Sequence, residues 1–373
     1  MHELSDMLLM HKDTAIAKIN GGILETVQPG LMPYFLARTG DIVTWLRDRA
    51  IDSHRTNSRL LKRTLRLQSK DDLDTVLYVH GATITDHYWI KRTDEAITYQ
   101  DVQFKTNIFD KLALYGDVNS LEKAPAPTPE LTNIGSFEKC WTRKDGSWYM
   151  MKAGTPKEQF SELFAYRLGR YLGFDMAVYQ YQDVYVISKD FTENGRYDFD
   201  PADGFVGDET DYLKIYNVIS ELCPQAANAY IDMCYLDALV YNFDRHEYNF
   251  GLLRDSETGQ AVKLAPLFDH NLSLISRGYR ESSNQANDRL VTDFVSFIKS
   301  LNRTVHIKTV NRLILNRICK SIPIPLQREA NIYNPRSFVI DFVLSRQASI
   351  FDKCKDFMHT DQPLLTKAQE PEL

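Results

Sequence analysis

A short polar segment, NFDRHEYNFG, places a carboxylate, an imidazole and a carboxamide directly before a strand-like run. The runs FGLLRD and AVKLAP surround the turn-rich SETGQ, which predicts a β-hairpin with its turn near Glu257. Because a hairpin brings the chain back to its start, Asp269 in LAPLFDHN is expected beside Asp244 and Asn249. Carboxylate and amide oxygens are ligands that suit Mg²⁺. The sequence therefore predicts a magnesium site at the open end of this hairpin.

Each of these side chains taken alone is more often a turn or capping residue than a catalyst. Their spacing changes that interpretation. An Asp followed five residues later by an Asn, and then by a strand, a turn, a strand and a second Asp, is the layout of a kinase catalytic loop and its metal-binding Asp. In that chemistry the first Asp accepts or orients the substrate hydroxyl, and the Asn and second Asp hold the metal ions that bridge the phosphates.

A kinase layout also requires a lysine on an upstream strand and a glutamate on the helix that follows it. Lys152 ends the strand-like run WYMMK, and Glu162 lies in KEQFSELFAYRLGRYLG, whose apolar residues have helical spacing up to Gly173. The strand of Lys152 is paired by a predicted hairpin at Asp145-Gly146. A strand-terminal lysine and a helical glutamate are common separately, but their order supports the kinase interpretation.

These segments resemble the HipA-type bacterial kinases, toxin-related relatives of protein and phosphoinositide kinases. The resemblance spans roughly Thr132 to Ile275, and its most specific part is the pattern Asp-x-His-x-x-Asn-Phe followed by a strand that ends in Pro-x-x-Asp. It is carried by GSFEKCW, MMK, SELFAYRLGRYLG, FDRHEYNFG and LAPLFDHN.

The resemblance implies ATP and Mg²⁺ as cofactors and gives the catalytic residues their roles. Asp244 would be the general base, and Asn249 and Asp269 would bind magnesium. His246 matches a family histidine and would support the loop through hydrogen bonds. A protein carrying a Ser or Thr hydroxyl would be the substrate, and an antitoxin-like protein is an expected partner.

The same resemblance implies an ATP-binding set. Lys152 would contact the α and β phosphates, with Glu162 as its orienting partner. The phosphate loop and the adenine-contacting hinge would contain Gly135, Ser136, Val186, Ile187, Ser188 and Lys189.

Some family relatives autophosphorylate a hydroxyl residue in the phosphate loop, which ejects the loop and silences the enzyme. Thr132 lies near that place, and Ser136 is the next candidate. The chain also departs from the family pattern. Its phosphate loop has one glycine, Gly135, and no Walker-type lysine motif, and His270 follows the metal Asp where an apolar residue is common.

The composition agrees with a globular protein. The 373 residues are 43% hydrophobic and 25% charged, and the net charge of -6 does not favour non-specific binding to nucleic acid or anionic membrane. Five scattered cysteines indicate neither a disulfide framework nor a zinc site. No run resembles a signal peptide or a membrane span, so we expect a cytoplasmic protein, with secretion as an effector as the alternative.

The predicted fold class is α+β, a bilobal protein-kinase-like fold with a β-rich small lobe, a mainly helical large lobe and an N-terminal accessory region. The proline-rich run from Leu121 to Asn133 predicts an extended connector. The expected domains are an accessory region at 1–120, an ATP-binding small lobe at 121–190 and a helical catalytic lobe at 191–373. Within the first, TAIAKI and TVLYVHGATI alternate like strands and DIVTWLRDRAI has helical spacing.

Two alternatives to a protein kinase stay open. A lipid or small-molecule kinase of the same superfamily would need a basic or apolar membrane-facing surface, for which only the basic run from Arg47 to Lys70 is a candidate. This run is a solvated helix face or a docking surface for an acidic partner. The third interpretation is a kinase-like binding module in which the site is retained but turnover is lost, or whose N-terminal basic segment binds nucleic acid together with an antitoxin partner. Nucleic acid is otherwise expected as a partner only indirectly, if at all.

Overall fold

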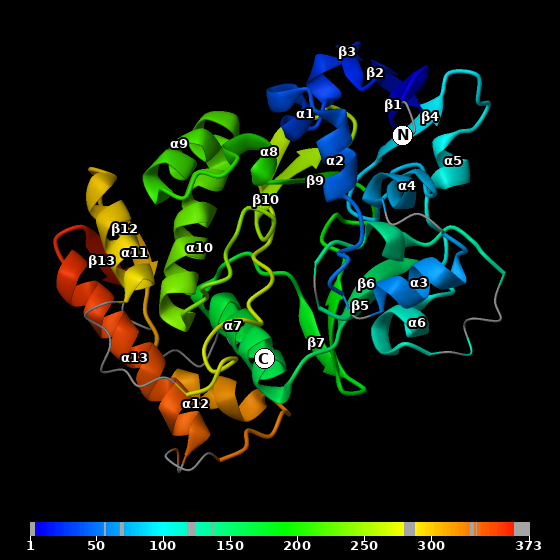
Figure 1. The fold of residues 1–373 in the computed structure, drawn as a ribbon. Helices are drawn as coiled ribbons and strands as arrows, with labels where there is room; N and C mark the ends of the chain where they lie inside the picture. The colour runs from blue at the N-terminus through cyan, green and yellow to red at the C-terminus, as the bar shows by residue number, and fades with distance from the viewer. Residues whose placement is uncertain are drawn as a thin grey trace. The chain divides into compact units, whose positions relative to one another are not determined.

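The computed structural model describes most of the chain and divides it into two compact units, which are interleaved in sequence. The first unit comprises residues 1–153, 182–207 and 251–263, and the second comprises 154–181, 208–250 and 264–373. The fold is α+β, as predicted (Figure 1). The described residues are 4–55, 57–67, 71–117, 119, 124–135, 137–279, 288–328, 332 and 334–361.

The first unit begins with an antiparallel sheet of strand order β3-β2-β1-β4, drawn in blue and cyan in Figure 1. Its strands are β1 (Met7–His11), β2 (Thr14–Asn20), β3 (Ile23–Thr26) and β4 (Tyr88–Arg92). Short helices cover its apolar residues in a core around Leu9, Ile16, Trp45 and Val76. These helices and turns are η1 (Pro29–Leu31), α1 (Tyr34–Thr39), α2 (Ile42–Asp48) and α4 (Asp72–Leu77). The helices α3 (Ser58–Thr64), α5 (Tyr99–Val102) and α6 (Asp110–Tyr115) contribute to a second core that contains Met10 and Trp89.

One N-terminal prediction is wrong. The alternating run from Thr75 to Ile84 was expected to be a strand, but its start belongs to α4. The Asp71 side chain accepts a hydrogen bond from the Leu73 N–H and caps the helix, and Leu73 and Val76 are buried in the core. Local capping and tertiary burial therefore outweigh the period-two pattern. The helix predicted in DIVTWLRDRAI is present as α2.

The proline-rich run is not an extended connector along its whole length. Residues Pro129–Thr132 form the 3₁₀ turn η3 and are all buried, while residues 120–123 lie outside the described part of the chain. The Glu130 carboxylate accepts from the main-chain N–H of Trp141 at 2.6 Å and pairs with Arg55 at 3.3 Å. This run is therefore anchored in the first unit by a buried charge pair.

The Arg55–Glu130 pair also changes the interpretation of the basic run. Arg55 is 1% exposed, Lys62 pairs with Asp72 at 3.1 Å, and Arg47 lies 3.6 Å from Asp71. Only part of this run therefore offers positive charge to solvent, which weakens the docking-surface interpretation. The exposed members among the described residues of α3 and the turn after it are Arg59, Arg63 and Arg66.

Two further groups of strands complete the first unit. Strands β5 (Lys139–Lys144), β6 (Ser147–Lys152) and β8 (Tyr185–Lys189) lie side by side in that order. The predicted hairpin between β5 and β6 turns at Asp145 and Gly146, both with positive φ. The other group has the strand order β11-β10-β9, with β9 (Tyr197–Pro201), β10 (Gly251–Asp255) and β11 (Ala261–Leu264), followed in sequence after β9 by the short helix α8 (Asp203–Val206).

The second unit is mainly helical. Helix α10 (Ala227–Val240) is buried on nearly every face and packs against α7 (Pro156–Leu172), α9 (Tyr212–Leu222), α11 (Arg289–Ser300) and α13 (Pro335–Cys354) (Figure 1). Helix α7 ends at Gly173 in the left-handed conformation, as the sequence predicts. The remaining elements are η4 (Pro224–Ala226), α12 (Arg312–Ser321), the parallel pair β12 (Val305–Lys308) and β13 (Met358–Asp361), and β7 (Tyr179–Gln182), where the chain passes into the first unit.

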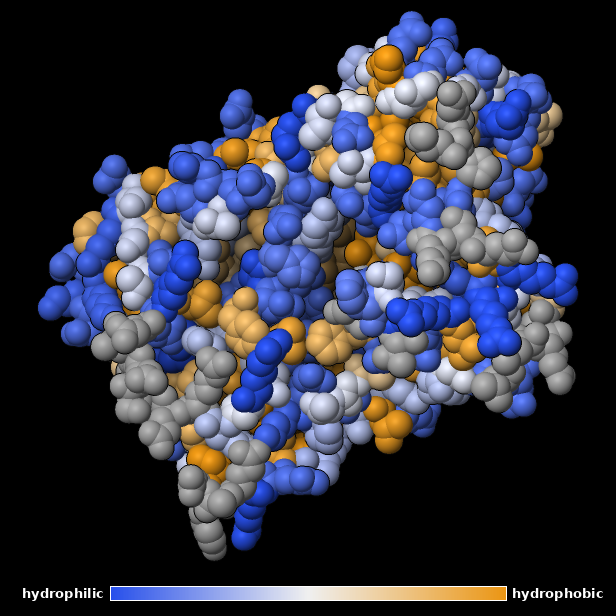
Figure 2. Space-filling model, in the orientation of Figure 1, coloured by the Kyte–Doolittle hydropathy of each residue, from blue (hydrophilic) through white to orange (hydrophobic). Residues whose placement is uncertain are grey.

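On the face drawn in Figure 2, apolar residues form scattered patches among hydrophilic ones. Among the described residues, no helix combines the length and apolar character needed to cross a membrane. All five cysteines are buried free thiols.

Candidate active site

The predicted catalytic loop follows α10 in the second unit. Tyr241 adopts the left-handed conformation and ends the helix, and Asn242 returns to Asp237 through both its main-chain N–H (3.0 Å) and its side-chain amide (2.8 Å). The next turns are tied by hydrogen bonds from the His246 N–H to the Asp244 carbonyl and from the Asn249 N–H to the His246 carbonyl, both 2.9 Å. The loop is thus a compact, internally bonded structure.

Asn249 is oriented by this loop. Its Nδ2 donates to the main-chain carbonyl of Asp244 at 2.9 Å, and the residue is 6% exposed. Because the amide nitrogen is used in this way, the Oδ1 atom is the end of the side chain that can meet a cation. This is the orientation that a magnesium ligand requires.

The Arg245 guanidinium joins the loop to the segment after β11 that carries Asp269. Its Nη1 donates both to the Asn249 carbonyl and, at 2.8 Å, to the Phe268 carbonyl. The other guanidinium nitrogens form a two-point contact with Asp237, at 2.8 and 3.0 Å. Since one nitrogen atom contacts residues 249 and 268, the segments of Asn249 and Asp269 are adjacent, as the hairpin argument predicts.

Asp269 has an unusual backbone. Its φ is +62°, in the left-handed region that residues other than glycine seldom adopt, and its N–H donates to the Tyr179 hydroxyl at 3.2 Å. Such strain is kept where surrounding contacts fix it, and functional sites are where it concentrates.

The Asp244 side chain is half-buried, and the negative charge of Asp269 affects its pKa. Burial raises the pKa of Asp244, with a further rise from the Asp269 carboxylate, and the His246 ring opposes both. A carboxylate made more basic by burial and by a second carboxylate is suited to accept a proton. Oxygen donors from Asp and Asn also match the ligand preference of Mg²⁺.

His246 is exposed, and its Nδ1 accepts a hydrogen bond from the Tyr248 N–H at 3.2 Å. The ring therefore contacts the backbone of its own loop, which agrees with the supporting role expected for it.

Glu162 contacts the segment after Asp269. Its Oε1 accepts from the main-chain N–H of His270 at 3.0 Å, and the side chain is buried on α7. The His270 Nε2 in turn lies 2.9 Å from Arg245 Nη2, so this histidine, which departs from the family pattern, is part of the Arg245 network. Glu162 thus links α7 to the segment that carries Asp269.

The expected ATP-binding residues of the first unit gather on one sheet. Lys152 on β6 is the direct cross-strand partner of Val186 on β8 and of Lys139 on β5. Cross-strand partners share a face of the sheet, so Lys139 and Lys152 project to the same side. Val186 and Ser188 are buried, Ile187 is partly buried and Lys189 is exposed.

Gly135 has a φ of +110°, which favours glycine, and a Cβ at this position would meet the Nζ atom of Lys139 at 2.6 Å. The Lys139 side chain therefore lies next to Gly135. Of the two candidate phosphorylation sites, Ser136 lies outside the described residues. Thr132 is buried, and its hydroxyl donates to the Ala82 carbonyl at 2.7 Å.

Three contributors were missed by sequence reasoning: Arg245, Asp237 and Lys139. Arg245 lies within the motif NFDRHEYNFG. The signal for its burial is Asp237, eight residues upstream on α10, which can pair with it. Lys139 is the partner of Lys152 once the turn at Asp145-Gly146 sets the register, so that hairpin was the available signal.

A family model described as the HipA-like C-terminal domain matches residues 111–323. No curated protein sequence is similar enough to match this chain.

Two solved structures are similar. One is the HipA, HipB and operator DNA complex of the Shewanella oneidensis MR-1 toxin–antitoxin system, with 10% identity, a TM-score of 0.54, and coverage of 93% of this chain and 97% of that chain. The other is the Helicobacter pylori proinflammatory kinase CtkA, with 16% identity, a TM-score of 0.43, and coverage of 59% of this chain and 90% of that chain. The first likeness supports the same overall fold.

Proposed function

Because the chain belongs to the family defined by the HipA-like C-terminal domain, we propose that it is a kinase that transfers the γ-phosphoryl group of ATP to a Ser or Thr hydroxyl of a protein. The main support is the contact of one Arg245 nitrogen with the carbonyls of both Asn249 and Phe268, which places the two proposed metal ligands in adjacent segments.

Each residue of the catalytic loop has a role in this proposal. Asp244 orients the substrate hydroxyl and accepts its proton, helped by the raised pKa that burial causes. Asn249 offers Oδ1 and Asp269 its carboxylate to magnesium. When bound, Mg²⁺ would neutralise charge on the β and γ phosphates. Arg245 and Glu162 keep the two segments in place through their main-chain contacts.

The ATP-binding assignment rests on the sheet of the first unit. Lys152 contacts the α and β phosphates, and Lys139, its cross-strand partner, adds a second positive charge beside Gly135. The main chain of Val186 to Lys189 serves the adenine, and Glu162 as a partner of Lys152 remains a prediction. In domain terms, residues 121–190 act as the ATP-binding small lobe and 191–373 as the catalytic lobe, with 1–120 as an accessory region.

Regulation and partners follow the family. Since HipA of Shewanella oneidensis is found in a complex with HipB and operator DNA, we propose an antitoxin-like protein partner for this chain, a toxin-type role and a cytoplasmic location. Autophosphorylation at Thr132 would require the turn Pro129–Thr132 to leave the core, because the Thr132 hydroxyl is buried and bonded. Phosphopeptide mapping after incubation with ATP and Mg²⁺ tests Thr132 and Ser136 together.

The test of the function uses purified full-length protein with ATP, Mg²⁺ and a generic protein acceptor such as casein. Asp244→Asn should bind nucleotide with unchanged affinity and lose roughly 10²-fold or more in transfer rate. The exposed Asp208→Asn is the matched control and should behave as wild type. Equal transfer by Asp244→Asn would refute the assignment of the base.

Two other outcomes would replace the proposal. Transfer to lipid or small-molecule hydroxyls but not to proteins would identify a different kinase class. Nucleotide binding by the wild type without any transfer, to itself or to casein, would identify a binding module.

A further inference from the structure

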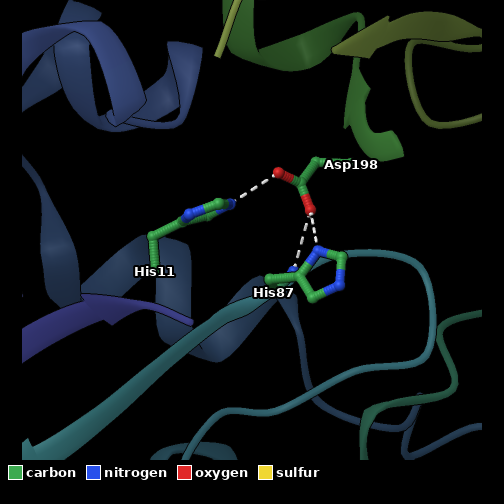
Figure 3. A group of neighbouring side chains, drawn as sticks. All are labelled: His11, His87 and Asp198. Atoms are coloured by element: carbon green, nitrogen blue, oxygen red, sulfur yellow. Dashed lines mark hydrogen bonds and ion pairs between the residues drawn. The ribbon is translucent and has the colours of Figure 1, made fainter. Parts of the chain in front are cut away.

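Three buried side chains of the first unit bring their polar atoms together (Figure 3). The Asp198 carboxylate on β9 lies between two imidazoles, with Oδ2 2.7 Å from His11 Nε2 and Oδ1 2.6 Å from His87 Nδ1. His11 ends β1, and His87 directly precedes β4. One ring nitrogen of each histidine and one carboxylate oxygen lie within 4.8 Å of one another, which is close enough for one ion to contact all three.

The contacts as they stand are hydrogen bonds. Burial would raise the pKa of Asp198, but the hydrogen bonds and charges of His11 and His87 outweigh it, and this pKa is lowered. An ionised carboxylate only accepts hydrogen bonds, so His11 carries a proton on Nε2 and His87 on Nδ1. Two protons therefore occupy the positions between the rings and the carboxylate.

Asp198 differs from other buried aspartates of the first unit in the charge that compensates it. Asp86 and Asp200 each pair with an arginine, at 2.8 and 2.9 Å. Within the described part of the chain, no arginine or lysine contacts Asp198, whose partners are His11 and His87. Buried charges in proteins are paired or coordinate metal ions. An imidazole is fully charged only when it is protonated, whereas a divalent cation would compensate Asp198 with both rings neutral.

Two imidazole nitrogens and one carboxylate oxygen are a donor set for a transition metal. Neutral imidazole is the commonest metal ligand in proteins, and it suits zinc, copper, iron and nickel. Zinc accepts two histidines and one carboxylate and leaves its fourth position to water. The candidate active site offers oxygen donors, which suit Mg²⁺ instead. The two donor sets therefore select different ions.

The geometry requires only a small adjustment. Ligand atoms at about 2.0–2.2 Å from a tetrahedral zinc ion are about 3.3 Å apart, so each ring would retreat by less than about 1 Å from its present contact. The carboxylate need not move, because the main-chain N–H of His87 donates to Asp198 Oδ1 at 3.0 Å and holds it independently of both rings. A neutral ring would shift its proton to its other nitrogen, and a protonated ring would release one proton to solvent.

The surroundings of the cluster favour a structural ion. His11 is 2% exposed, His87 8% and Asp198 1%. The His11 ring lies 5.0 Å from the ring of Tyr88, and the His87 ring lies 5.3 Å from that of Tyr99, both between centroids. A shell of this kind limits the access of solvent to a bound ion.

We propose that His11, His87 and Asp198 bind one divalent transition-metal ion, best matched by Zn²⁺, as a structural site of the first unit. The ion would join β1, the start of β4 and β9 through ligands that are separated in sequence by 111 and 187 residues from Asp198. Because folding alone brings such distant ligands together, ion binding would stabilise the folded chain. The site does not depend on the proposed kinase function.

The test starts from full-length protein that a chelator has stripped of metal ions. The protein is dialysed against Zn²⁺ with an excess of Mg²⁺, which occupies oxygen-ligand sites, and the retained zinc is counted by mass spectrometry. We expect one tightly bound zinc ion per chain. The unfolding temperature should rise by at least about 4 °C, because an ion that binds only the folded state stabilises it.

The variant His11→Gln separates an ion site from a set of hydrogen bonds. Its amide can still donate to Asp198 but is not a usual zinc ligand. His54→Gln is the matched control, because His54 also contacts a carboxylate, Asp52 at 3.0 Å, but its side chain is 89% exposed. His11→Gln should bind zinc at least about tenfold more weakly and lose the zinc-dependent rise in unfolding temperature, and His54→Gln should behave as wild type.

Nitrogen NMR of the histidine side chains gives a readout that needs no variant. Without zinc, His11 should carry its proton on Nε2 and His87 on Nδ1. With zinc, these two nitrogens should bind the ion, and the protons should lie on His11 Nδ1 and His87 Nε2. This measurement decides the proposal if His11→Gln does not fold.

Three results would overturn the proposal. Failure of the wild type to retain zinc would show that hydrogen bonds alone hold the cluster. Equal zinc affinity in wild type and His11→Gln would place the ion elsewhere in the chain, and so would unchanged ring protonation in the zinc-loaded protein. None of these measurements uses phosphoryl transfer, so a failure of the kinase proposal is distinguishable from a failure of this one.

Discussion

The side-chain amide nitrogen of Asn249 is bonded to the main-chain carbonyl of Asp244, at 2.9 Å. This contact orients Asn249, the proposed metal ligand, through the main chain of Asp244, the proposed base. Metal binding and proton acceptance therefore depend on the same loop conformation.

Removing the Asn249 side chain should weaken magnesium binding more than nucleotide binding. We expect Asn249→Ala to raise the Mg²⁺ concentration needed for half-maximal transfer by at least about tenfold, because an oxygen ligand is lost. The measurement is a Mg²⁺ titration at fixed ATP. The exposed Asn119→Ala is the control, and an unchanged titration for Asn249→Ala would exclude Asn249 as a ligand.

Arg245→Met should be strongly destabilising. It leaves the buried Asp237 carboxylate without its two-point partner and removes the donor to the Phe268 carbonyl, a loss of about 3–5 kcal/mol in the free energy of unfolding. Urea denaturation measures this value. Arg289→Met in the exposed Arg289–Asp293 pair should cost only about 0.5 kcal/mol. Similar losses in both variants would contradict the proposed importance of the buried network.

The two cross-strand lysines of β5 and β6, Lys139 and Lys152, should differ in the size of their effects. Lys152→Met should reduce transfer by about 10²-fold or more through loss of phosphate stabilisation. Lys139→Met should chiefly raise the KM for ATP. Lys144→Met, at the exposed end of the same hairpin, serves as control. Steady-state kinetics at varied ATP distinguish these cases, and a silent Lys139→Met would remove Lys139 from the site.

The pH dependence of the free energy of unfolding should show whether the Asp198 side chain is ionised in the folded, metal-free protein. Because its pKa is lowered in the folded protein, the carboxylate contributes stability that is present above its unfolded pKa of about 3.9 and is lost as the pH falls towards the folded value. Asp198→Asn should therefore be less stable than wild type near pH 7, and the gap should narrow below about pH 4. Chemical denaturation at several pH values checks this, and a constant gap would contradict the ionised state.

The turn of the β10-β11 hairpin gives a test with a close internal control. Gly259 and Gly146 both have positive φ, +70° and +79°, but a Cβ at Gly259 would collide with the Gly30 carbonyl, whereas one at Gly146 meets nothing within 4 Å. Gly146→Ala should cost about 1 kcal/mol from backbone strain, and Gly259→Ala clearly more. Equal losses of unfolding free energy would mean that the hairpin turn does not contact the N-terminal region.

Local signals in the sequence were sufficient to predict several of the elements that carry the candidate site residues. The hairpin at Asp145-Gly146, the end of α7 at Gly173 and the hairpin with its turn at Glu257 follow from turn chemistry and periodicity, which act over a few residues. The adjacency of the Asn249 and Asp269 segments could be predicted as well, because a hairpin brings its two ends together whatever surrounds it.

The amino-acid sequence by itself determined the motif, its order and the side chains that can serve a kinase. Only the tertiary structure decided how these parts are held. In it, the run that starts at Thr75 forms the end of a capped helix and not the expected strand. Arg55 of the basic run is buried against Glu130, and Arg245 connects the segments of Asn249 and Asp269. The tertiary structure also placed β9 and β10 with the N-terminal sheet, because buried charges such as Asp198 must find partners wherever the fold brings donors close, and those partners lie more than a hundred residues away in the sequence.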